Sequence, residues 1–265
     1  MTQGIGIMQK FYLGIDVGGS KIRGILLDSP KKKYSFAFNV NTPKNRKKFL
    51  KILEREIVKI IKAGKIAGIG IGLPGIVDIK KGILIKAPHL PFLNNWPAKK
   101  FLLRFNKNLK FDNDSRCFMI SEAMLGAGKE YKNIIGITIG TGIGGGIVIN
   151  SKIYYGKNYG AGEFGKMVIA HKKTFEQLGA KEAFLKIGDT SKIIGIGIAN
   201  LINILDPGIV ILGGGGIYSG KMKIGTVRKT AKKYIMSPLA KKTPIIKGKL
   251  GENSQAIGAA LLFKI

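Results

Sequence analysis

Two glycine-rich turns carry the residues best suited to bind phosphate. The first is Gly18–Lys21 and the second is Gly140–Gly146, and each follows an apolar segment of the kind that forms a strand. Glycine lets successive backbone N–H groups converge on phosphate oxygens with no side chain in the way. Ser20 adds a hydroxyl to the first turn, and Asp16, just before it, can hold a metal ion directly or through water. Each turn alone is also compatible with an ordinary β-hairpin, in which Gly-Gly is common.

The second turn matches a dinucleotide-binding fingerprint, but its context argues against that function. Gly140, Gly142 and Gly145 have the Gly-x-Gly-x-x-Gly spacing, yet Gly145 leads into the β-like Ile147–Asn150 and not into a helix. A Walker phosphate loop is excluded because no glycine is followed by Lys-Ser or Lys-Thr. We therefore interpret this segment as a β-turn-β loop that presents backbone N–H groups.

Acidic residues are scarce, 15 in 265, so those in glycine-rich or apolar settings are candidates for chemistry. Asp114 follows the strand-like Leu109–Phe111 and stands where a helix should begin. A carboxylate there can cap the helix, or it can face a substrate and take a proton from an attacking hydroxyl. The cluster of Asn113, Asp114 and Ser115 is able to serve both roles. Glu163, flanked by glycines, is suited to bind a polyol beside the phosphates.

The hydrophobic periodicity predicts an order of elements that occurs twice. The first series, three strands, a long helix and a strand, is expected at Phe11–Asp16, Ile22–Asp28, Lys33–Val40, Asn45–Ala63 and Ile66–Gly72. The second series follows a helix at Ser115–Leu125 and is expected at Ile134–Ile139, Gly145–Ile149, Lys152–Tyr155, Thr174–Lys186, Ser191–Ile204 and Ile209–Leu212. A repeated β-β-β-α-β order at this spacing indicates an α/β protein of two related lobes, because the repeats of a solenoid are far shorter.

The net charge is +30, from 45 lysines and arginines against 15 acidic residues. A basic surface attracts nucleic acid, but here the basic residues are scattered in short runs, and no docking helix or aromatic-basic motif accompanies them. We interpret the excess of lysine as a compositional bias and expect no nucleic-acid partner. No stretch of about 18 apolar residues occurs, so we expect no membrane partner either.

The single cysteine, Cys117, lies in an apolar stretch and excludes a disulfide framework. The N-terminus lacks the pattern of a secretory signal. Both observations predict a cytoplasmic protein. Residues 1–7 precede the first strand-like segment and are expected to be an extension without function.

Several motifs, in order along the chain, resemble the sugar kinases of the ROK family, named for repressors, open reading frames and kinases. They are Gly14–Asp28 (GIDVGGSKIRGILLD), Gly68–Asp78 (GIGIGLPGIVD), Asn113-Asp114, Ile137–Val148 (ITIGTGIGGGIV), Gly160–Gly165 (GAGEFG), Asn203–Gly215 (NILDPGIVILGGG) and Gln255–Ala260, the last similar to the family's final helix. The resemblance implies two ribonuclease-H-like lobes, as in actin, hexokinase and the heat-shock ATPases, with a central cleft. The N-terminal lobe, on the sugar and phosphate side, would comprise residues 1–114 with 252–265, and the nucleotide-side lobe residues 115–251.

The resemblance also implies roles for the matching residues. Asp114 would be the general base that deprotonates a sugar hydroxyl, and Mg²⁺ would bridge the phosphates close to Asp16. The sugar would contact the backbone of Gly75 and the side chains of His89, Asn113, Glu163 and Glu176. The two turns would hold the β- and γ-phosphates and a third glycine run would lie near adenosine, through Gly18, Gly19, Ser20, Lys21, Gly140, Thr141, Gly142, Gly144, Gly145, Gly213, Gly214 and Gly215.

The chain departs from the family on the sugar side. Most members bind structural zinc through a histidine after the Gly-Glu-x-Gly motif and a cysteine-rich loop, whereas here the histidine position is Lys166 and the cysteines are absent. We therefore expect no zinc. Met167–Thr174 forms a shortened link to Glu176, and Lys166 is either a solvated lysine or a contact to a hydroxyl or phosphate. His171, in this link, is expected at the surface, and His89 is either a pocket residue or an ordinary loop histidine.

The expected function is ATP-dependent phosphorylation of a hexose by a homodimeric, glucokinase-like enzyme, with glucose to glucose 6-phosphate as the favoured reaction. One alternative is a polyphosphate-dependent glucokinase of the same fold, in which the excess lysine would guide the polyanion. A second is a catalytically inactive sugar-binding sensor. The family's repressors carry an N-terminal helix-turn-helix region, and only about ten residues precede the first strand here, so regulation of DNA is not expected.

Overall fold

The computed structural model describes residues 10–29 and 31–263, so the expected extension at residues 1–7 lies outside the described part of the chain. By its internal contacts the chain divides into two compact units. Unit 1 runs to Cys117 and resumes at Gln255, and unit 2 comprises Phe118–Ser254. The boundaries fall within two helices, α3 (Asp114–Met124) and α9 (Ser254–Leu261).

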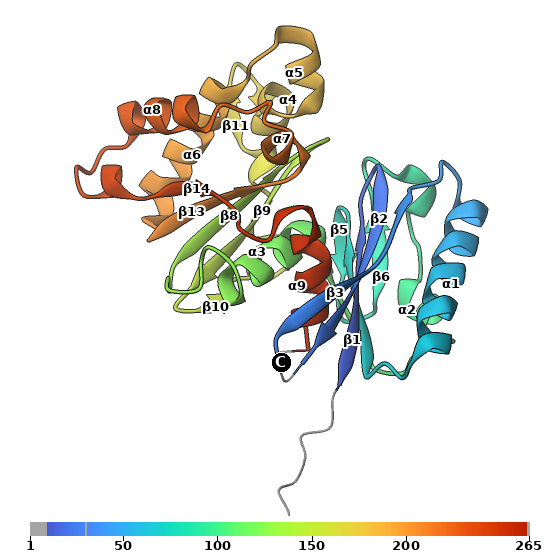
Figure 1. Cartoon of the computed structure of the whole chain (residues 1–265). Coiled ribbons are helices and arrows are strands. Elements are labelled where there is room, and N and C mark those ends of the chain that lie inside the picture. The colour runs from blue at the N-terminus through green and yellow to red at the C-terminus, as the bar shows by residue number, and fades with distance from the viewer. Residues whose placement is uncertain (1–9, 30, 264–265) are drawn as a thin grey trace, which may run out of the picture. The chain divides into compact units, whose positions relative to one another are not determined.

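Unit 1 is built on a five-stranded sheet in the order β3-β2-β1-β4-β7. β1, β2 and β3 pair antiparallel, whereas β4 is parallel to β1 and β7 is parallel to β4. The helices α1 and α9 lie on opposite faces of this sheet (Figure 1). Besides α3 and α9, the elements of unit 1 are β1 (Phe11–Val17), β2 (Lys21–Asp28), β3 (Lys33–Asn41), α1 (Arg46–Ala63), β4 (Gly68–Leu73), β5 (Ile76–Asp78), β6 (Ile83–Lys86), η1 (Pro91–Leu93), α2 (Ala98–Leu102) and β7 (Leu109–Asn113).

The alternation of side chains along β1 explains the two layers that cover it. Leu13 and Ile15 point to one face, where they join Phe49 and Leu53 of α1 in a fully buried core. α1 begins after Asn45, whose side chain caps the helix by accepting a backbone N–H at 2.9 Å. Within the described residues, no helix combines the length and the apolar character needed to cross a membrane.

The opposite face of the unit 1 sheet has glycines where α9 approaches it. Gly14 and Gly70 are neighbours on β1 and β4. A Cβ atom at Gly14 would lie 2.0 Å from the carbonyl oxygen of Ala256, and one at Gly70 would lie 1.9 Å from that of Ala259. The backbone of α9 therefore packs directly on the backbone of the sheet, and neither glycine can be enlarged without moving the helix.

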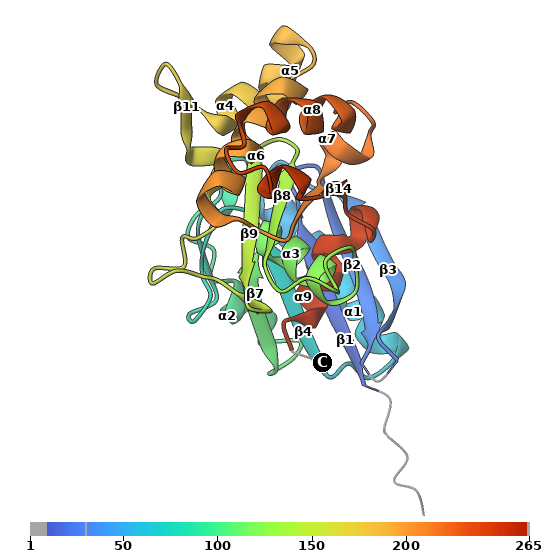
Figure 2. The same ribbon diagram turned by 90° about the vertical axis from the view of Figure 1, so that its left-hand side faces the viewer.

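Unit 2 repeats this plan with the sheet order β10-β9-β8-β13-β14. β8, β9 and β10 pair antiparallel, and β13 is parallel to both β8 and β14. α4, α5, α6 and α8 gather on one side of the sheet (Figure 2). The elements are β8 (Ile134–Ile139), β9 (Ile143–Ile149), β10 (Lys152–Ile153), η2 (Phe164–Lys166), β11 (Val168–Ala170), β12 (Lys173–Thr174), α4 (Phe175–Gly179), α5 (Lys181–Ile187), α6 (Ser191–Leu205), β13 (Ile209–Gly213), α7 (Gly215–Tyr218), α8 (Ile224–Tyr234), η3 (Ala240–Lys242), β14 (Ile245–Lys247) and η4 (Gly251–Asn253).

The two faces of the unit 2 sheet also follow from strand alternation. Ile137 of β8 packs in one buried core with Ile198 of α6 and Val227 of α8. On the opposite face, Phe118 of α3 fills the space that a side chain at Gly213 would need, since a Cβ there would lie 2.3 Å from its ring. The sheet is thus enclosed between α6 and α8 on one side and α3 on the other.

The predicted duplication of the β-β-β-α-β order is confirmed by the two sheets. Each has an antiparallel three-stranded part followed by two parallel strands, and β1 and β8 occupy the same central place. The predicted glycine turns occupy equivalent places too, because Gly18–Ser20 joins β1 to β2 and Gly140–Gly142 joins β8 to β9. The prediction succeeded because strand alternation and glycine turns are local properties of sequence.

The helix expected over Thr174–Lys186 is instead two helices, α4 and α5. Ala180 lies between them in an extended conformation. The backbone N–H of Lys181 donates to the carbonyl oxygen of Gly140 at 3.0 Å, so it does not continue the α4 hydrogen-bond ladder. A contact with the second glycine turn therefore breaks a helix that periodicity alone would have continued.

Other boundaries differ because pairing partners, and not propensity, end a strand. The strand expected over Lys152–Tyr155 covers only Lys152–Ile153, and the last hydrogen bond to β9 runs from the N–H of Tyr154 to the carbonyl oxygen of Ile147 at 2.8 Å. The loop expected over Gly140–Gly146 is only a three-residue turn, since β9 begins at Ile143 and pairs with β8 at once. The sequence analysis did not anticipate β5, β6, α2, β11, β12, α7, α8 or β14.

Replacing Gly70 by alanine should destabilise the protein. The added Cβ would overlap the carbonyl oxygen of Ala259, and overpacking of this kind costs about 1–3 kcal/mol, or more against backbone. Gly64→Ala is the matched control, because Gly64 has an extended φ of 174° and no atom lies within 4 Å of its Cβ position. Urea unfolding should give a lower midpoint for the Gly70 variant only; equal midpoints would show that α9 does not need this glycine.

Candidate active site

Four residues form a row across the unit 1 sheet, one from each of four adjacent strands. Arg23 of β2 is in register with Asp16 of β1, Asp16 with Gly72 of β4, and Gly72 with Asp112 of β7. In-register neighbours place their side chains on the same face of a sheet. Asp16, Gly72 and Asp112 are each the next-to-last residue of their strand, so the row lies at the carboxyl edge of the parallel strands, where α/β proteins bind ligands.

Gly72 leaves the gap into which the start of α3 fits. A Cβ atom at Gly72 would lie 3.2 Å from Sγ of Cys117 and 3.4 Å from Cα of Asp114. The first turn of α3 therefore lies over the middle of the row. This position brings Asp114 near Asp16, which precedes it by 98 positions in the printed sequence.

Asn113, and not Asp114, caps α3. β7 extends to Asn113, and the helix begins at the next residue. The Oδ1 atom of Asn113 accepts hydrogen bonds from the backbone N–H groups of Ser115 at 2.9 Å and Arg116 at 3.3 Å. Its Nδ2 donates to the carbonyl oxygen of Gly75 at 3.0 Å. The capping role that the sequence left open for Asp114 therefore belongs to its neighbour.

A buried ion pair between Arg116 and Asp112 holds the junction of β7 and α3. Nε of Arg116 lies 2.6 Å from Oδ1 of Asp112, and the two side chains are only 4% and 1% exposed. The same oxygen accepts the backbone N–H of Asn113 at 2.7 Å. Removing one member of a buried pair leaves an uncompensated charge, so both residues are needed to hold the β7–α3 turn. The sequence analysis predicted neither residue; a helix-spaced Asp-x-x-x-Arg was the available sign.

Asp114 is half-buried at the first position of α3. Its Oδ1 accepts the backbone N–H of Ser115 at 2.7 Å. The partial positive charge of a helix N-terminus favours a negative charge at this position. A carboxylate that is held in place and partly accessible has the properties of a proton acceptor.

Asp16 is buried beside this carboxylate. Burial, and then the charge of Asp114, raise the pKa of Asp16 to about 7, while Arg23 opposes the rise from 3.8 Å away. Burial and the carboxylates of Asp112, Asp114 and Asp16 likewise raise the pKa of the Cys117 thiol, which is therefore no nucleophile. Arg23 is a third residue that the sequence analysis missed, since only the β1–β2 register reveals it.

Gly75 is joined to this group, whereas His89 is not. Gly75 has a φ of 90°, and a Cβ there would lie 2.2 Å from the carbonyl oxygen of Lys86, so the position requires glycine. Its own carbonyl accepts the Asn113 amide described above. His89 is exposed in the turn after β6, and within the described residues no hydrogen bond or ion pair links it to Asp114 or Asn113.

The first glycine turn is closed by its own backbone and by a threonine. The N–H of Gly18 donates to the carbonyl oxygen of Lys21 at 2.9 Å. Thr42 donates its hydroxyl to the carbonyl oxygen of Gly18 at 2.7 Å, and its N–H to that of Ser20 at 2.9 Å. Gly19, Ser20 and Lys21 are exposed at the tip. The turn is therefore ordered without a ligand, and its tip remains accessible.

The second turn is held by α4 and α5. The N–H of Gly140 donates to Gly142 across the turn at 2.9 Å, and Thr141 is exposed at the tip. Glu176, at the start of α4, accepts the N–H of Ile143 at 2.9 Å through Oε2. Its Oε1 accepts a hydrogen bond from Nζ of Lys166 at 2.8 Å. Lys166, for which the sequence left open a solvated side chain or a ligand contact, is therefore the ion-pair partner of Glu176.

Among the remaining glycines of the second run, Gly145 also allows close packing. Gly144 and Gly145 lie within β9, and a Cβ at Gly145 would lie 2.3 Å from the ring of Phe164. Glu163, immediately before that ring, is exposed. His171 is exposed in the turn between β11 and β12, where the sequence placed it.

The third glycine run forms the turn from β13 into α7. Gly213 ends the strand, and Gly215 begins the helix. Gly214 has a φ of 87°, and a Cβ there would lie 2.4 Å from the carbonyl oxygen of Ile139. Because β8 and β13 are parallel neighbours, this turn lies at the same sheet edge as the second glycine turn.

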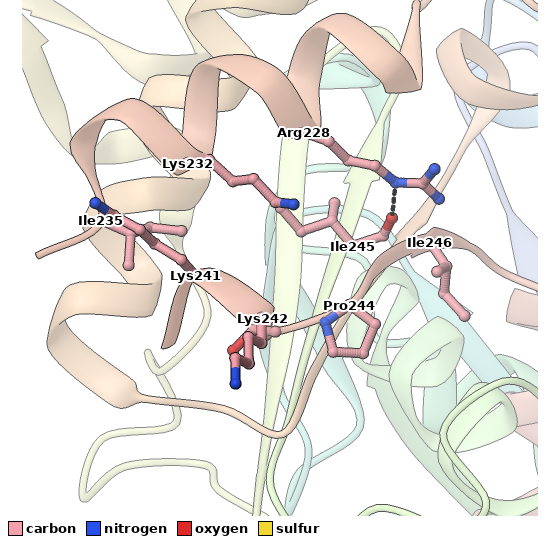
Figure 3. Close-up of a pocket in the computed structure, with 9 residues that line it drawn as sticks. Arg228, Lys232, Ile235, Lys241, Lys242, Pro244, Ile245 and Ile246 are labelled. Carbon is pink, nitrogen blue, oxygen red and sulfur yellow. Dashed lines mark hydrogen bonds between the residues drawn. The ribbon is translucent and has the colours of Figure 1, made fainter. Parts of the chain in front are cut away.

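A basic groove of about 200 Å³ lies at the opposite end of the unit 2 sheet. It is bounded by α8, η3 and the start of β14, and its cations are Arg228, Lys232, Lys241 and Lys242. Nε of Arg228 donates to the carbonyl oxygen of Ile245 at 2.7 Å, and the four cationic side chains spread apart and do not converge (Figure 3). The groove is thus distinct from the glycine turns, and the sequence analysis did not predict it.

The donor set fits magnesium bound mainly through phosphates. Among the described residues no group of three or more histidine, cysteine or acidic side chains is arranged to hold a metal ion. Mg²⁺ typically binds one or two carboxylates, waters and substrate phosphates, without a full protein cage. Asp16 is such a carboxylate, buried two residues before the first glycine turn, and a nearby cation would favour its ionised form.

The chain is similar to a known protein family and to characterised proteins within it. The ROK family matches residues 12–181 and 169–265. The chain is 28% identical over 306 residues to the N-acetyl-D-glucosamine kinase of Histophilus somni (strain 129Pt), which covers 95% of this chain and 98% of that protein. It is 35% identical over 157 residues to the N-acetylgalactosamine kinase AgaK of Shewanella sp. (strain ANA-3), where the match covers 58% of this chain but only 50% of that protein.

A solved structure has the same fold. It is a ROK family glucokinase from Streptomyces griseus in complex with glucose and AMPPNP, with a TM-score of 0.84 and 22% identity over 95% of this chain and 98% of that one. This likeness confirms the expected α/β fold class with two ribonuclease-H-like lobes. The chain therefore belongs to the ROK family and is one of its sugar kinases.

Proposed function

We propose that this sugar kinase transfers the terminal phosphoryl group of ATP to a hexose, converting glucose to glucose 6-phosphate, with Asp114 as the general base. The observation that carries the proposal is the position of Asp114. It is half-buried, held at the N-terminus of α3 by the Asn113 cap, and placed beside the buried carboxylate of Asp16. A carboxylate so placed can remove a proton from a hydroxyl while its neighbour attracts a cation.

The proposed step balances without a further reactant. The sugar hydroxyl oxygen forms a bond to the γ-phosphorus as its proton passes to Asp114. The bond between that phosphorus and the bridging oxygen breaks, and its electron pair leaves with ADP. Such transition states need positioning and charge stabilisation more than covalent help from the protein.

The sugar contacts are assigned from both units. We assign Gly75, His89 and Asn113 from unit 1 and Glu163 and Glu176 from unit 2. One amide hydrogen of Asn113 has no partner among the described residues and is available to a hydroxyl. The carboxylate of Glu176 has two protein donors, which leaves lone pairs for a ligand.

The donor contacts are assigned to the three glycine turns. The β- and γ-phosphates are placed at Gly18, Gly19, Ser20 and Lys21 and at Gly140, Thr141, Gly142, Gly144 and Gly145, and adenosine near Gly213, Gly214 and Gly215. Magnesium, when bound, neutralises phosphate charge. Asp16 would hold it directly or through water. We further propose a cytoplasmic homodimer without zinc, with the sugar-side lobe at residues 1–114 and 252–265 and the nucleotide-side lobe at residues 115–251.

N-acetylglucosamine is the second candidate acceptor. The support for it is the N-acetyl-D-glucosamine kinase of Histophilus somni, which aligns with 95% of this chain. A panel of glucose, mannose, fructose, N-acetylglucosamine and N-acetylmannosamine, with Mg²⁺ and ATP, separates the candidates by kcat/KM. Turnover of none of them would overturn the proposed function and favour a sugar sensor.

Polyphosphate is the second candidate donor. Its support is the +30 net charge and the basic groove around Arg228 and Lys232. Because the groove lies at the other end of the unit 2 sheet from the second and third glycine turns, roughly 13 Å along the strands, a long polyanion can reach it from a phosphate bound at those turns. We expect turnover with ATP that changes little with salt, whereas turnover with polyphosphate that falls steeply between 50 and 200 mM salt would favour the alternative.

Replacing Asp114 by asparagine should remove the proton acceptor and keep the shape of the site. We expect kcat to fall about a hundred- to ten-thousand-fold while the dissociation constant for glucose changes little. Asp206→Asn is the control, since Asp206 is exposed and has a positive φ of 41° that asparagine also adopts. Steady-state kinetics and calorimetry check both; near wild-type kcat in the Asp114 variant would exclude it as the base.

Replacing Asp16 by asparagine should stabilise the ligand-free protein, and more so at high pH. The pKa of Asp16 rises from 3.8 to about 7 on folding, so its contribution to stability is complete below pH 3.8 and is lost as the pH rises to about 7. The stability gained by the variant should grow by roughly 2 kcal/mol between pH 5.5 and pH 8. Urea unfolding without Mg²⁺ or nucleotide measures it, and a pH-independent difference would contradict the raised pKa.

A further inference from the structure

Glu176 connects two segments of unit 2 that the proposed function assigns to different substrates. Its Oε2 accepts the backbone N–H of Ile143, the first residue after the second glycine turn, at 2.9 Å. Its Oε1 accepts from Nζ of Lys166 at 2.8 Å. Lys166 belongs to η2, the short helix that follows Glu163. One carboxylate thus bridges the turn assigned to the donor and the segment assigned to the sugar.

The backbone packing around this bridge is close. A Cβ at Gly165 would lie 2.2 Å from the carbonyl oxygen of Ile143 and 3.2 Å from Cβ of Glu176. The N–H of Lys166 donates to the carbonyl oxygen of Glu163 at 3.0 Å, so a displacement of the Lys166 backbone would also shift the backbone of Glu163. η2, α4 and the glycine turn therefore meet around the two oxygens of Glu176.

The pair is too exposed to matter mainly for stability. The side chain of Lys166 is 58% exposed and that of Glu176 is 22% exposed. Solvent-exposed ion pairs contribute little to folding because water screens them and ordering the side chains costs entropy. Lys166 is nonetheless directed at the carboxylate that binds the glycine turn, so its main effect is on where Glu176 points.

We propose that Lys166 is a positioning residue that fixes Glu176 and so couples the sugar segment at Glu163 to the glycine turn at Gly140–Gly142. Without the ammonium group, Glu176 keeps its bond to Ile143 but loses the partner that aligns it with η2. Sugar binding and donor binding in unit 2 then become less dependent on each other. This inference rests on the proposed function, because it takes Glu163 and Glu176 as sugar contacts and the turn as a phosphate contact.

The test compares Lys166→Met with Lys166→Arg, which keeps the charge. We expect the methionine variant to raise the KM for the sugar roughly tenfold, to leave kcat within about threefold and to leave the melting temperature within about 3 °C. The arginine variant, which keeps the charge, should have a KM for the sugar close to that of the wild type. Glu176→Gln should raise the KM for the sugar about as much as Lys166→Met does. The KM of the double variant should not exceed that of the more impaired single variant, since the two residues act as one unit.

Lys186→Met is the matched control. Lys186 and Glu182 form a pair on α5 at 2.6 Å, against 2.8 Å for Lys166 and Glu176, but both side chains are exposed and, within the described residues, no hydrogen bond links either to the glycine turn. This variant should keep wild-type KM values. Unchanged KM in Lys166→Met, or the same change in Lys186→Met, would overturn the proposal.

A separate measurement distinguishes a failure of the inference from a failure of the proposed function. Calorimetric titration of AMPPNP with and without glucose gives the coupling between the two ligands in the wild type and in Lys166→Met. We expect glucose to strengthen AMPPNP binding in the wild type and to do so several-fold less in the variant. An inactive wild type would overturn the function, whereas an active wild type with equal coupling in both proteins would overturn only the role of Lys166.

Discussion

The site of unit 1 depends on two carboxylates that are held together where water is scarce. Asp16 is buried, and the charge of Asp114 adds to the cost of ionising it. The pair is tolerated because Arg23 lies on one side of it and the N-terminus of α3 on the other. Gly72 lets α3 approach β4 closely, since a Cβ atom there would lie 3.2 Å from Sγ of Cys117, which would have to shift by a few tenths of an ångström. A cation delivered with a phosphate ligand would complete the balance of charge at this site.

The sequence could predict structure that depends on neighbours along the chain. It could not predict element boundaries and contacts that residues far apart in the sequence determine. The duplicated strand order followed from alternation and from the two glycine turns, and both were confirmed. The break between α4 and α5 could not be predicted, because it is caused by the hydrogen bond from Lys181 to Gly140. The cap at Asn113 depended on β7 continuing two residues beyond its apolar run, which pairing with β4 decides. The bond between Lys166 and Glu176 required the fold, since nothing in a ten-residue separation specifies it.

The two units share an architecture but differ in the charge that precedes their glycine turns. Asp16 stands two residues before the first glycine turn, and Thr138 stands two residues before the second. The cross-strand partner of Asp16 is Arg23, whereas that of Thr138 is Gly144. Only unit 1 therefore carries a carboxylate and a compensating cation at this position. In unit 2 the corresponding place is neutral, and the charged pair lies instead between η2 and α4.

The glycines under α9 also constrain the order in which the molecule can be completed. α9 comprises residues 254–261, whereas the strands that it covers, β1 and β4, end before residue 74. Unit 2 is synthesised in between and is continuous in the chain, so it can fold as soon as it emerges. Until residues 254–261 have left the ribosome and packed, the glycine face of the unit 1 sheet lacks the helix that covers it. During synthesis the half of the protein that begins first is thus the half that is finished last, and its open sheet face is the surface on which a nascent chain would need protection.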